Sequence, residues 1–161
     1  LFRASVSLRP YVTLRTGGAA ERFGVVRSAD EFAEAATWAH ALDAPLTVLG
    51  WGSNVLPSDA GVPGLVLVND ARALEFGEGG EVIAETGIGM QDLFLATVQR
   101  GLVGLQFAVG IPGTLGGALV SNAGAYRNEI STFVRSVEVV DRGVRKWVEP
   151  EWLGFSYRDS R

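Results

Sequence analysis

A short apolar run leads directly into a glycine-rich loop at residues 46–55, Leu46-Thr47-Val48-Leu49-Gly50-Trp51-Gly52-Ser53-Asn54-Val55. The run Leu46–Leu49 lacks polar alternation, which predicts a buried parallel strand. Upstream, apolar residues at the spacing of one helix face predict a helix over residues 29–42. Ser28 is its predicted N-cap, and Glu31, three residues later, completes a capping box.

Two further strands extend this pattern on either side. Phe23–Arg27 is predicted to form a strand before the helix, and Leu65–Val68 a strand after the loop. A strand, a helix and two more strands in this order are typical of a small α/β lobe, which we assign to residues 1–70. Before it, Arg9-Pro10 predicts an extended segment, because proline disfavours the helical region for the residue that precedes it.

The second part of the chain, residues 71–161, has the pattern of an antiparallel α+β lobe. Turn residues between β-prone runs predict two hairpins, and a glycine marks the end of the one longer helix. The expected elements are a hairpin of 72–76 with 81–85, a helix over 90–100 ended by Gly101, a hairpin of 134–140 with 144–148, and a short helical turn over 150–153.

Composition excludes several classes of protein. The chain of 161 residues is 47% hydrophobic and 20% charged, which is too apolar for a disordered chain. Its net charge of -4 has the wrong sign for a domain held to nucleic acid by phosphate neutralisation. Cysteine is absent, His40 is the one histidine, and the acidic group Glu75, Glu78 and Glu81 has no ligand spacing, so no metal site is expected. No apolar run is long enough to cross a bilayer and no signal peptide is visible, so we expect no membrane contact and a cytoplasmic location.

The loop Gly50–Val55 has two interpretations. Backbone amides at a strand end can hold a phosphate, and Ser53 and Asn54 add side-chain donors. The same pattern is also common in ordinary tight turns, and Val55 stands where a dinucleotide-binding fingerprint has its third glycine. Both interpretations remain open from the residues alone.

A second small-residue loop, Gly110–Ala118, precedes a helix expected to open near Thr114. It offers amide donors, a hydroxyl and room for a flat or anionic ligand, although close packing of a helix through Gly116 and Gly117 explains the glycines equally well. Neither loop carries a basic side chain, so binding would depend on amides and dipoles. Later in the chain, Arg158 is either a carboxylate-binding group or an ordinary surface arginine.

Four stretches together resemble the UDP-N-acetylenolpyruvoylglucosamine reductase family, also called UDP-N-acetylmuramate dehydrogenases. They cover nearly the whole chain and follow the family's order. The stretches are Thr13–Ala20 (TLRTGGAA), Leu49–Leu56 (LGWGSNVL), Gly110–Ala118 with Asn122–Tyr126 (GIPGTLGGA and NAGAY), and Gly154–Ser160 (GFSYRDS). Ser156 stands where the family usually has glycine.

The resemblance implies an α+β (α/β) fold, a two-lobed FAD-binding domain of the vanillyl-alcohol-oxidase / p-cresol methylhydroxylase type. It implies that Arg158 is the catalytic arginine, and that Tyr157 and Arg158 bind substrate. The residues implied to contact non-covalently bound FAD are Gly50, Trp51, Gly52, Ser53, Asn54, Val55, Gly110, Ile111, Pro112, Gly113, Thr114, Gly116, Gly117, Ala118, Asn122, Ala123 and Gly124.

The resemblance also implies a reaction. An oxidoreductase of this family takes hydride from NADPH onto FAD and passes it to the enolpyruvyl ether of a UDP-sugar, giving UDP-N-acetylmuramate. That product serves peptidoglycan biosynthesis, and hence cell wall biogenesis, cell shape and cell division. The family's C-terminal domain supplies the protonating serine, a glutamate and much of the UDP-sugar site, and we expect residues 1–161 to be the FAD-binding part without it.

Two alternatives remain beside this interpretation. One is another FAD-dependent oxidase or dehydrogenase of the same fold, for which covalent flavin attachment is disfavoured because cysteine is absent and His40 lies outside both loops. The other is a non-catalytic nucleotide-binding module, against which the retained Arg158 argues.

Overall fold

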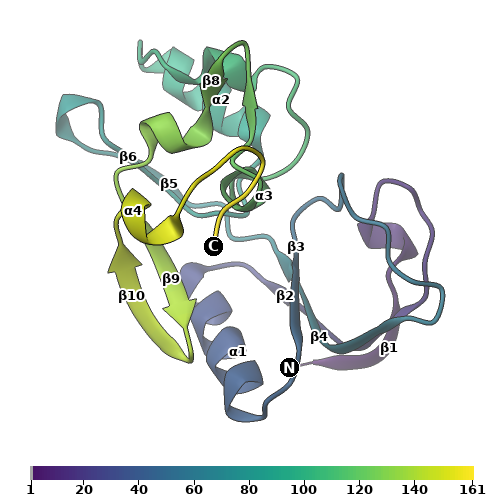
Figure 1. The fold of residues 1–161 in the computed structure, drawn as a ribbon. Helices are drawn as coiled ribbons and strands as arrows, with labels where there is room; N and C mark the ends of the chain where they lie inside the picture. Colours follow the sequence, from purple (N-terminus) through teal and green to yellow (C-terminus); the bar gives the residue numbers. More distant parts are fainter. Residues whose placement is uncertain (1) are drawn as a thin grey trace. The chain divides into compact units, whose positions relative to one another are not determined.

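A four-stranded mixed sheet organises the first part of the computed structural model, which describes residues 2–161 (Figure 1). The strands lie in the order β1-β2-β4-β3; β1 pairs antiparallel with β2, whereas β4 runs parallel to both β2 and β3. The predicted parallel strands are therefore confirmed. Their bounds are β1 Arg3–Ser7, β2 Ala19–Val26, β3 Leu46–Leu49 and β4 Val62–Asn69.

The expected burial of Leu46–Leu49 is wrong for one face of that strand. Leu46 and Val48 are exposed, because β4 lies between β2 and β3 and leaves β3 at the edge of the sheet. Helix α1, Ala29–Ala41, packs on β2 and β4. Its alanines form one small core with Val26, Leu65 and Leu67, and a second core on the sheet contains Leu8, Phe23, Leu49 and Val66.

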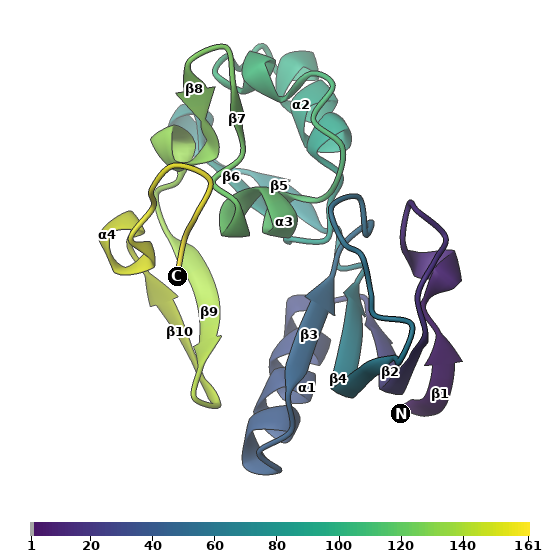
Figure 2. The same cartoon turned by 45° about the vertical axis from the view of Figure 1, so that its right-hand side comes forward.

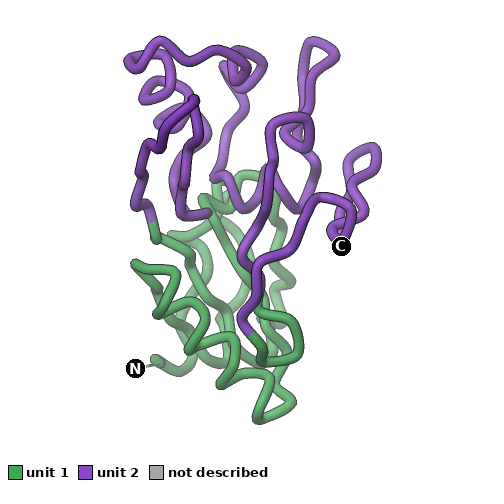
Figure 3. Tube along the Cα trace, turned by 90° about the vertical axis from the view of Figure 1, so that its left-hand side faces the viewer, with its two compact units in different colours: residues 1–71, 140–144 green, residues 72–139, 145–161 purple. Residues whose placement is uncertain are grey.

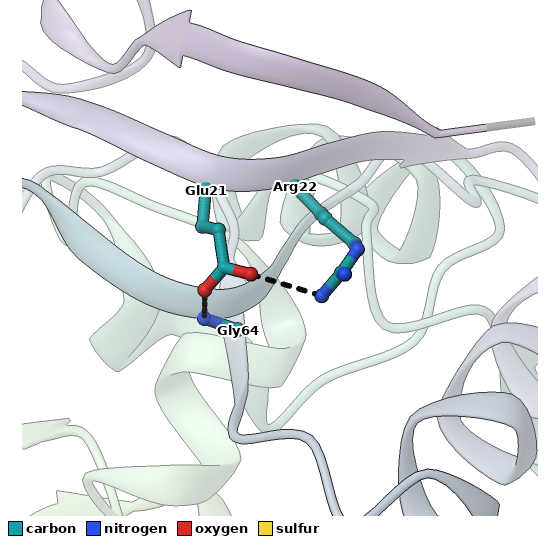
Figure 4. A network of polar contacts seen from close by, with 3 residues as sticks. All are labelled: Glu21, Arg22 and Gly64. Carbon is teal, nitrogen blue, oxygen red and sulfur yellow. Dashed lines mark hydrogen bonds and ion pairs between the residues drawn. The ribbon is translucent and has the colours of Figure 1, made fainter.

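A bulge in β4 is stabilised by an acidic side chain (Figure 4). The register moves from Ala20↔Val62 to Arg22↔Leu65, so β4 carries one extra residue opposite Glu21. The Glu21 carboxylate accepts a hydrogen bond from the Gly64 N–H at 2.9 Å and pairs with Arg22 at 3.0 Å. Gly64 has φ +76°, and a Cβ there would lie 2.2 Å from the Pro45 carbonyl oxygen, so the bulge requires glycine.

The predicted start of the first helix is confirmed with one change. The Ser28 hydroxyl accepts a hydrogen bond from the Glu31 N–H at 3.1 Å, as an N-cap does. The Glu31 carboxylate, however, accepts from the Arg27 N–H at 2.7 Å, one residue before the position that a capping box uses.

Short elements make up the second part of the chain (Figure 2). The two predicted hairpins, the long helix and the short helical turn are all present. Their bounds are β5 Leu74–Phe76, β6 Val82–Ala84, α2 Met90–Gln99, α3 Leu115–Val120, β7 Gly124–Ala125, β8 Asn128–Glu129, β9 Val137–Asp141, β10 Val144–Val148 and α4 Pro150–Leu153. Met90, Phe107, Ala118 and Ile130 form the centre of its core.

Two expectations near element ends are wrong. The segment at Arg9-Pro10 is a 3-10 turn over Arg9–Tyr11, because proline is compatible with a first helical turn, and the strand β1 precedes it. The strand β9 begins at Val137 and not at 134, because Val134 closes the 3-10 turn over Ile130–Phe133 and the chain bends at Arg135 before the strand starts.

The chain divides into two compact units (Figure 3). Unit 1 contains residues 1–71 and 140–144, and unit 2 contains residues 72–139 and 145–161. The tip of the β9–β10 hairpin thus belongs to unit 1, where the Thr37 hydroxyl donates a hydrogen bond to the Gly143 carbonyl at 3.3 Å. Within residues 2–161, no helix is both long enough and apolar enough to cross a membrane.

Helices α1, α2 and α3 end in the same backbone motif. After α1, α2 and α3, the next residue but one has positive φ, and its N–H and the following N–H bond back to the last helical turn. The left-handed residues are Asp43 (φ 49°), Gly101 (φ 73°) and Asn122 (φ 39°). Aspartate and asparagine tolerate this conformation better than other non-glycine residues do.

Candidate functional site

The first glycine loop, in unit 1, is fixed by close backbone contacts. Gly52 is buried with φ +61°, and a Cβ there would lie 2.2 Å from the Tyr11 carbonyl oxygen. The Gly52 carbonyl accepts a hydrogen bond from the Thr13 N–H at 3.1 Å. Glycine is therefore required at position 52 by the fold itself, which supports the tight-turn interpretation for this residue.

The motif at residues 13–20 packs against the continuation of this loop. A Cβ at Gly17 would lie 2.8 Å from Cβ of Pro57, and one at Gly18 would lie 2.5 Å from the Asp59 carbonyl oxygen. The Gly18 N–H also donates to the Ser58 carbonyl at 2.9 Å. Two of the four family-like stretches are thus parts of one interlocked structure in unit 1.

Polar groups remain exposed at the tip of the same loop. Trp51, Ser53 and Asn54 are exposed, whereas Gly52 between them is buried. The backbone contacts at Gly52 therefore hold a hydroxyl and a carboxamide at the surface, where both can bond a polar ligand. Val55 packs against the core that contains Leu49, so its side chain has a structural role.

The second loop, in unit 2, offers fewer amide donors than the sequence suggests. The N–H groups of Leu115, Gly116 and Gly117 donate to Ile88 O, Thr86 O and the Thr114 hydroxyl, at 2.9, 2.8 and 3.4 Å. The first turn of α3 is thus satisfied by protein groups. Among residues 2–161, no hydrogen bond is found for the amides of Gly110, Gly113 and Thr114, which remain the donors of this loop; Gly110 is exposed, whereas Gly113 and Thr114 are buried.

Space for a ligand also lies along this loop. No heavy atom is within 4 Å of a Cβ built at Gly110, and at exposed Gly117 the nearest is the Thr114 hydroxyl at 3.7 Å. Gly116 differs, because its Cβ would lie 3.1 Å from the Thr86 carbonyl oxygen. Gly110 and Gly117 therefore leave open surface beside amide donors, which fits a flat or anionic group placed against the main chain. Ile111 packs on the core of unit 2 and Pro112 is exposed.

Arg158 lies in a tight turn of unit 2. The N–H of Ser156 donates to Asp159 O at 3.0 Å, and the N–H of Asp159 donates to Ser156 O at 3.3 Å. Arg158 has φ +60° in this turn, a conformation that costs a side-chain-bearing residue roughly 1–2 kcal/mol. Such strain is concentrated at functional positions.

The Arg158 side chain is directed toward the segment 122–124. Its guanidinium donates to the Gly124 carbonyl at 3.2 Å and lies 5.7 Å from the Tyr157 ring centroid. Both side chains are exposed, with Tyr157 at 87%. The structure thus brings the catalytic candidate Arg158 together with Asn122 and Gly124 within unit 2, and it leaves most of the guanidinium donors available to a carboxylate.

Asn122 and Ala123 are buried, unlike the exposed arginine beside them. The Asn122 side chain bonds Glu129, Ser131 and Ser156 inside unit 2. A contact between Asn122 and a cofactor would therefore have to use its backbone. Ala118 is buried in the core, so it supports the loop from below.

Two residues of this region carry no sequence signal that could have identified them. Thr86 fixes the start of α3 through its backbone carbonyl, which every residue type possesses. Glu129 bonds Asn122 at 2.8 Å from an otherwise exposed position. Its importance depends on the pairing of β7 with β8, two strands too short to be recognised from their residues.

The comparisons with known proteins agree with the four motifs. A UDP-N-acetylenolpyruvoylglucosamine reductase of Synechococcus sp. (strain JA-3-3Ab) is 42% identical over 99% of this chain, which spans 52% of that protein. One from Chlamydia pneumoniae is 39% identical over 99% of this chain and 53% of its own length. The chain thus spans about half the length of these curated relatives. Their shared name confirms the resemblance drawn from the motifs.

Solved structures confirm the predicted fold class. The crystal structure of UDP-N-acetylenolpyruvylglucosamine reductase (MurB) from Thermus caldophilus has a TM-score of 0.79 and 34% identity, over 99% of this chain and 57% of that one. A solvent-stable cholesterol oxidase has a TM-score of 0.66 at 22% identity over 92% of this chain and 32% of that one, and shows the fold alone. The FAD binding domain family matches residues 20–144. The chain belongs to the family of FAD binding domains.

Proposed function

We propose that this chain is the FAD-binding part of an NADPH-dependent reductase that converts the enolpyruvyl ether of a UDP-sugar to its lactyl ether, UDP-N-acetylmuramate, for peptidoglycan biosynthesis. The observation that carries the proposal is Arg158, held with positive φ and bonded to Gly124 at 3.2 Å in the unit that also carries the second glycine loop. The relatives with about 40% identity support it.

The residues proposed to hold FAD come from both loops. In unit 1 these are the exposed groups of Trp51, Ser53 and Asn54, supported by Gly50, Gly52 and Val55. In unit 2 the amides of Gly110 and Gly113 donate, and Gly117 leaves room for close approach. Ile111, Pro112, Thr114, Gly116, Ala118, Asn122, Ala123 and Gly124 complete the proposed set. When bound, FAD supplies the hydride-carrying chemistry that no amino-acid side chain provides.

Arg158 is proposed to act on the substrate. Its fixed fork of donors binds the enolpyruvyl carboxylate in bidentate geometry and stabilises negative charge that develops beside it. The exposed Tyr157 ring lies next to it and contacts the same substrate. We assign the proton donor and most of the UDP-sugar contacts to the remaining half of the full-length reductase, and the reaction to the cytoplasm, where NADPH is available.

A visible absorption spectrum of the full-length protein tests the proposal. Bound flavin should lose its colour when NADPH is added without oxygen, and regain it when the enolpyruvyl UDP-sugar follows. The Arg158→Lys variant keeps the charge but loses the fork, so it should still be bleached by NADPH and should recolour at least about 100-fold more slowly, the usual effect of removing one such donor.

The other outcomes identify the alternatives. No recolouring of the reduced flavin by the enolpyruvyl UDP-sugar, together with bleaching of the oxidised flavin by an alcohol or sugar that donates hydride to it, indicates a different oxidoreductase of the same fold. Failure of the full-length protein to take up FAD leaves a non-catalytic module and overturns the proposal.

A further inference from the structure

The most completely bonded polar side chain near Arg158 is that of Asn122. It is only 3% exposed and occupies the left-handed position after helix α3, with φ 39°. Its N–H donates to Leu119 O at 3.1 Å and the next N–H, of Ala123, donates to Ala118 O at 2.8 Å. This backbone motif ends the helix and aims the carboxamide into unit 2.

Three hydrogen bonds fix the orientation of this carboxamide. Its NH₂ donates to the Glu129 carboxylate at 2.8 Å and to the Ser156 carbonyl at 2.9 Å, and its oxygen accepts from the Ser131 N–H at 3.3 Å. In a flipped amide, the oxygen would face the two acceptors and the NH₂ would face the Ser131 N–H donor. Only the observed orientation is therefore compatible with the partners. Both donors and the acceptor are used.

One of these partners belongs to the turn that carries Arg158. Ser156 forms both backbone hydrogen bonds of the Ser156–Asp159 turn. The same turn has two other links to this region: the Ser160 hydroxyl donates to Val120 O at 3.1 Å, and Arg158 donates to Gly124 O at 3.2 Å. Both of these bonds are exposed, whereas the bond from the buried Asn122 side chain to Ser156 is part-buried and therefore competes less with water.

We infer that Asn122 is a positioning residue for Arg158: its carboxamide holds the Ser156–Asp159 turn in the shape that keeps Arg158 strained and directed at segment 122–124. The catalytic consequence rests on the proposed function of Arg158. Asn122 touches neither substrate nor the reacting atoms in this role. It acts by holding the arginine near one geometry, since a displacement of about 1 Å can lower a rate by 100-fold.

The role of Asn122 in ending helix α3 can be tested separately from its role in positioning Arg158, because helix α1 ends in the same way. Asp43 occupies the equivalent left-handed position with φ 49°, and the N–H groups of Asp43 and Ala44 bond back to His40 O and Ala39 O. The Asp43 side chain is exposed. Asp43→Gly is therefore a matched control for Asn122→Gly, since both variants relieve positive φ but only one removes a buried carboxamide.

Tryptic cleavage after Arg158 tests the positioning role without any activity measurement. Proteases need an extended segment, so a fixed turn is cut slowly. In the full-length protein we expect Asn122→Gly to raise cleavage at Arg158–Asp159 about tenfold relative to cleavage after Arg100, an exposed site at the end of α2 in the same unit. Asp43→Gly should leave this ratio unchanged. An unchanged ratio in Asn122→Gly overturns the inference whether or not the protein is a reductase.

The two half-reactions test the catalytic consequence. Asn122→Gly should slow recolouring by the enolpyruvyl UDP-sugar about 10- to 100-fold more than it slows bleaching by NADPH, because glycine keeps the backbone through which position 122 would contact FAD. In an Arg158→Ala background, Asn122→Gly should cause no further loss, because it acts through the arginine. An additional loss in that background, or equal slowing of both half-reactions, contradicts a positioning role. Failure of the wild-type protein to recolour concerns the proposed function alone, and the cleavage ratio then decides the inference.

A second pair of variants separates stability from position. Asn122→Asp places a carboxylate opposite Glu129 and the Ser156 carbonyl, and both contacts become repulsive. Adding Glu129→Gln supplies a donor toward the new aspartate but none toward Ser156. We expect the melting temperature of the double variant to lie closer to that of wild type than the melting temperature of Asn122→Asp does. The cleavage ratio and the recolouring rate should stay as they are in Asn122→Asp. Recovery of all three would show that Glu129, and not the turn, is the partner that matters.

Discussion

In the loop at residues 50–55, a side chain at Gly52 would collide with the backbone of Tyr11 at 2.2 Å, whereas in the loop at 110–118 a side chain at Gly110 or Gly117 would enter open or loosely filled space. The two loops look alike in sequence, and both belong to the motifs that resemble one reductase family. In unit 1, packing requires glycine at position 52, and the groups available to a ligand are the polar side chains of Ser53 and Asn54 beside it. In unit 2, Gly110 and Gly117 leave the surface bare, whereas Gly116 packs against Thr86.

This difference separates two meanings of a glycine-rich motif. Where a Cβ would strike backbone, the glycine is required for folding with or without a ligand. At Gly117, which lies in a helix without positive φ and where a Cβ meets only an ordinary contact, folding does not explain the glycine, and a ligand that approaches the main chain does. Gly110 also leaves open space, although its φ of +80° favours glycine there as well. Substitutions at the two kinds of position should therefore change stability and FAD affinity in different proportions.

The largest effect is expected for Gly52→Ala. Positive φ and a 2.2 Å backbone overlap act together, so we expect the free energy of unfolding to fall by about 3 kcal/mol or more, a large part of the roughly 5–15 kcal/mol available to a domain. Urea unfolding measures the change. Gly110→Ala, with φ +80° but no overlap, is the matched control and should cost only about 1–2 kcal/mol. Equal losses in the two variants would remove the distinction between the loops.

A smaller loss is expected for Thr114→Ala. The Thr114 hydroxyl is buried and accepts the Gly117 N–H at 3.4 Å, so its removal should cost about 1 kcal/mol, the usual value for an N-cap. Thermal unfolding measures it, and Thr114→Ser, which keeps the hydroxyl, should recover most of the loss. If Ser and Ala behave alike, the methyl group and not the cap is responsible.

Gly117→Ala should raise stability and weaken cofactor binding at once. The new methyl group meets only an ordinary contact at 3.7 Å, and alanine in a helix is favoured over glycine by about 0.5–1 kcal/mol. FAD affinity, measured by quenching of flavin fluorescence, should fall about tenfold, equivalent to about 1.4 kcal/mol. A variant that is more stable and binds FAD normally would show that this surface does not contact the cofactor.

The smallest change in stability is expected for Asn54→Ala. Asn54 is exposed, so the free energy of unfolding should stay within about 0.5 kcal/mol of wild type. Its carboxamide is a proposed cofactor contact, so FAD affinity should fall by about 1 kcal/mol, or roughly fivefold, when the hydrogen bond is lost. Parallel urea and fluorescence titrations on one preparation distinguish this pattern from that of Gly52→Ala.

Local signals in the sequence predicted most elements of the fold. Ser28 and Glu31 mark the start of α1, the glycine-rich turn at residues 77–80 marks the β5–β6 hairpin, and Gly101 marks the end of α2. Each is a short-range effect that neighbouring residues determine. The position of β3 at the sheet edge was not predictable, because it depends on where β4 inserts.

The candidate site was predictable from motifs but not from physical pattern alone. Glycine spacing left both a tight turn and a phosphate loop open at residues 50–55. The collision at Gly52 and the occupied amides of Leu115, Gly116 and Gly117 depend on segments distant in sequence, such as Tyr11 and Thr86. The roles of Asn122 and Glu129 depend in the same way on contacts between residues 7 and 34 positions apart.

The division of the β9–β10 hairpin has a consequence for synthesis on the ribosome. Residues 140–144 complete unit 1, where Gly143 packs beside His40 and bonds Thr37, yet the chain must first pass through residues 72–139 of unit 2. The N-terminal sheet can therefore form early, but helix α1 keeps part of its surface uncovered until residue 144 has left the exit tunnel. Unit 1, although first in sequence, is completed only after most of unit 2 has been made.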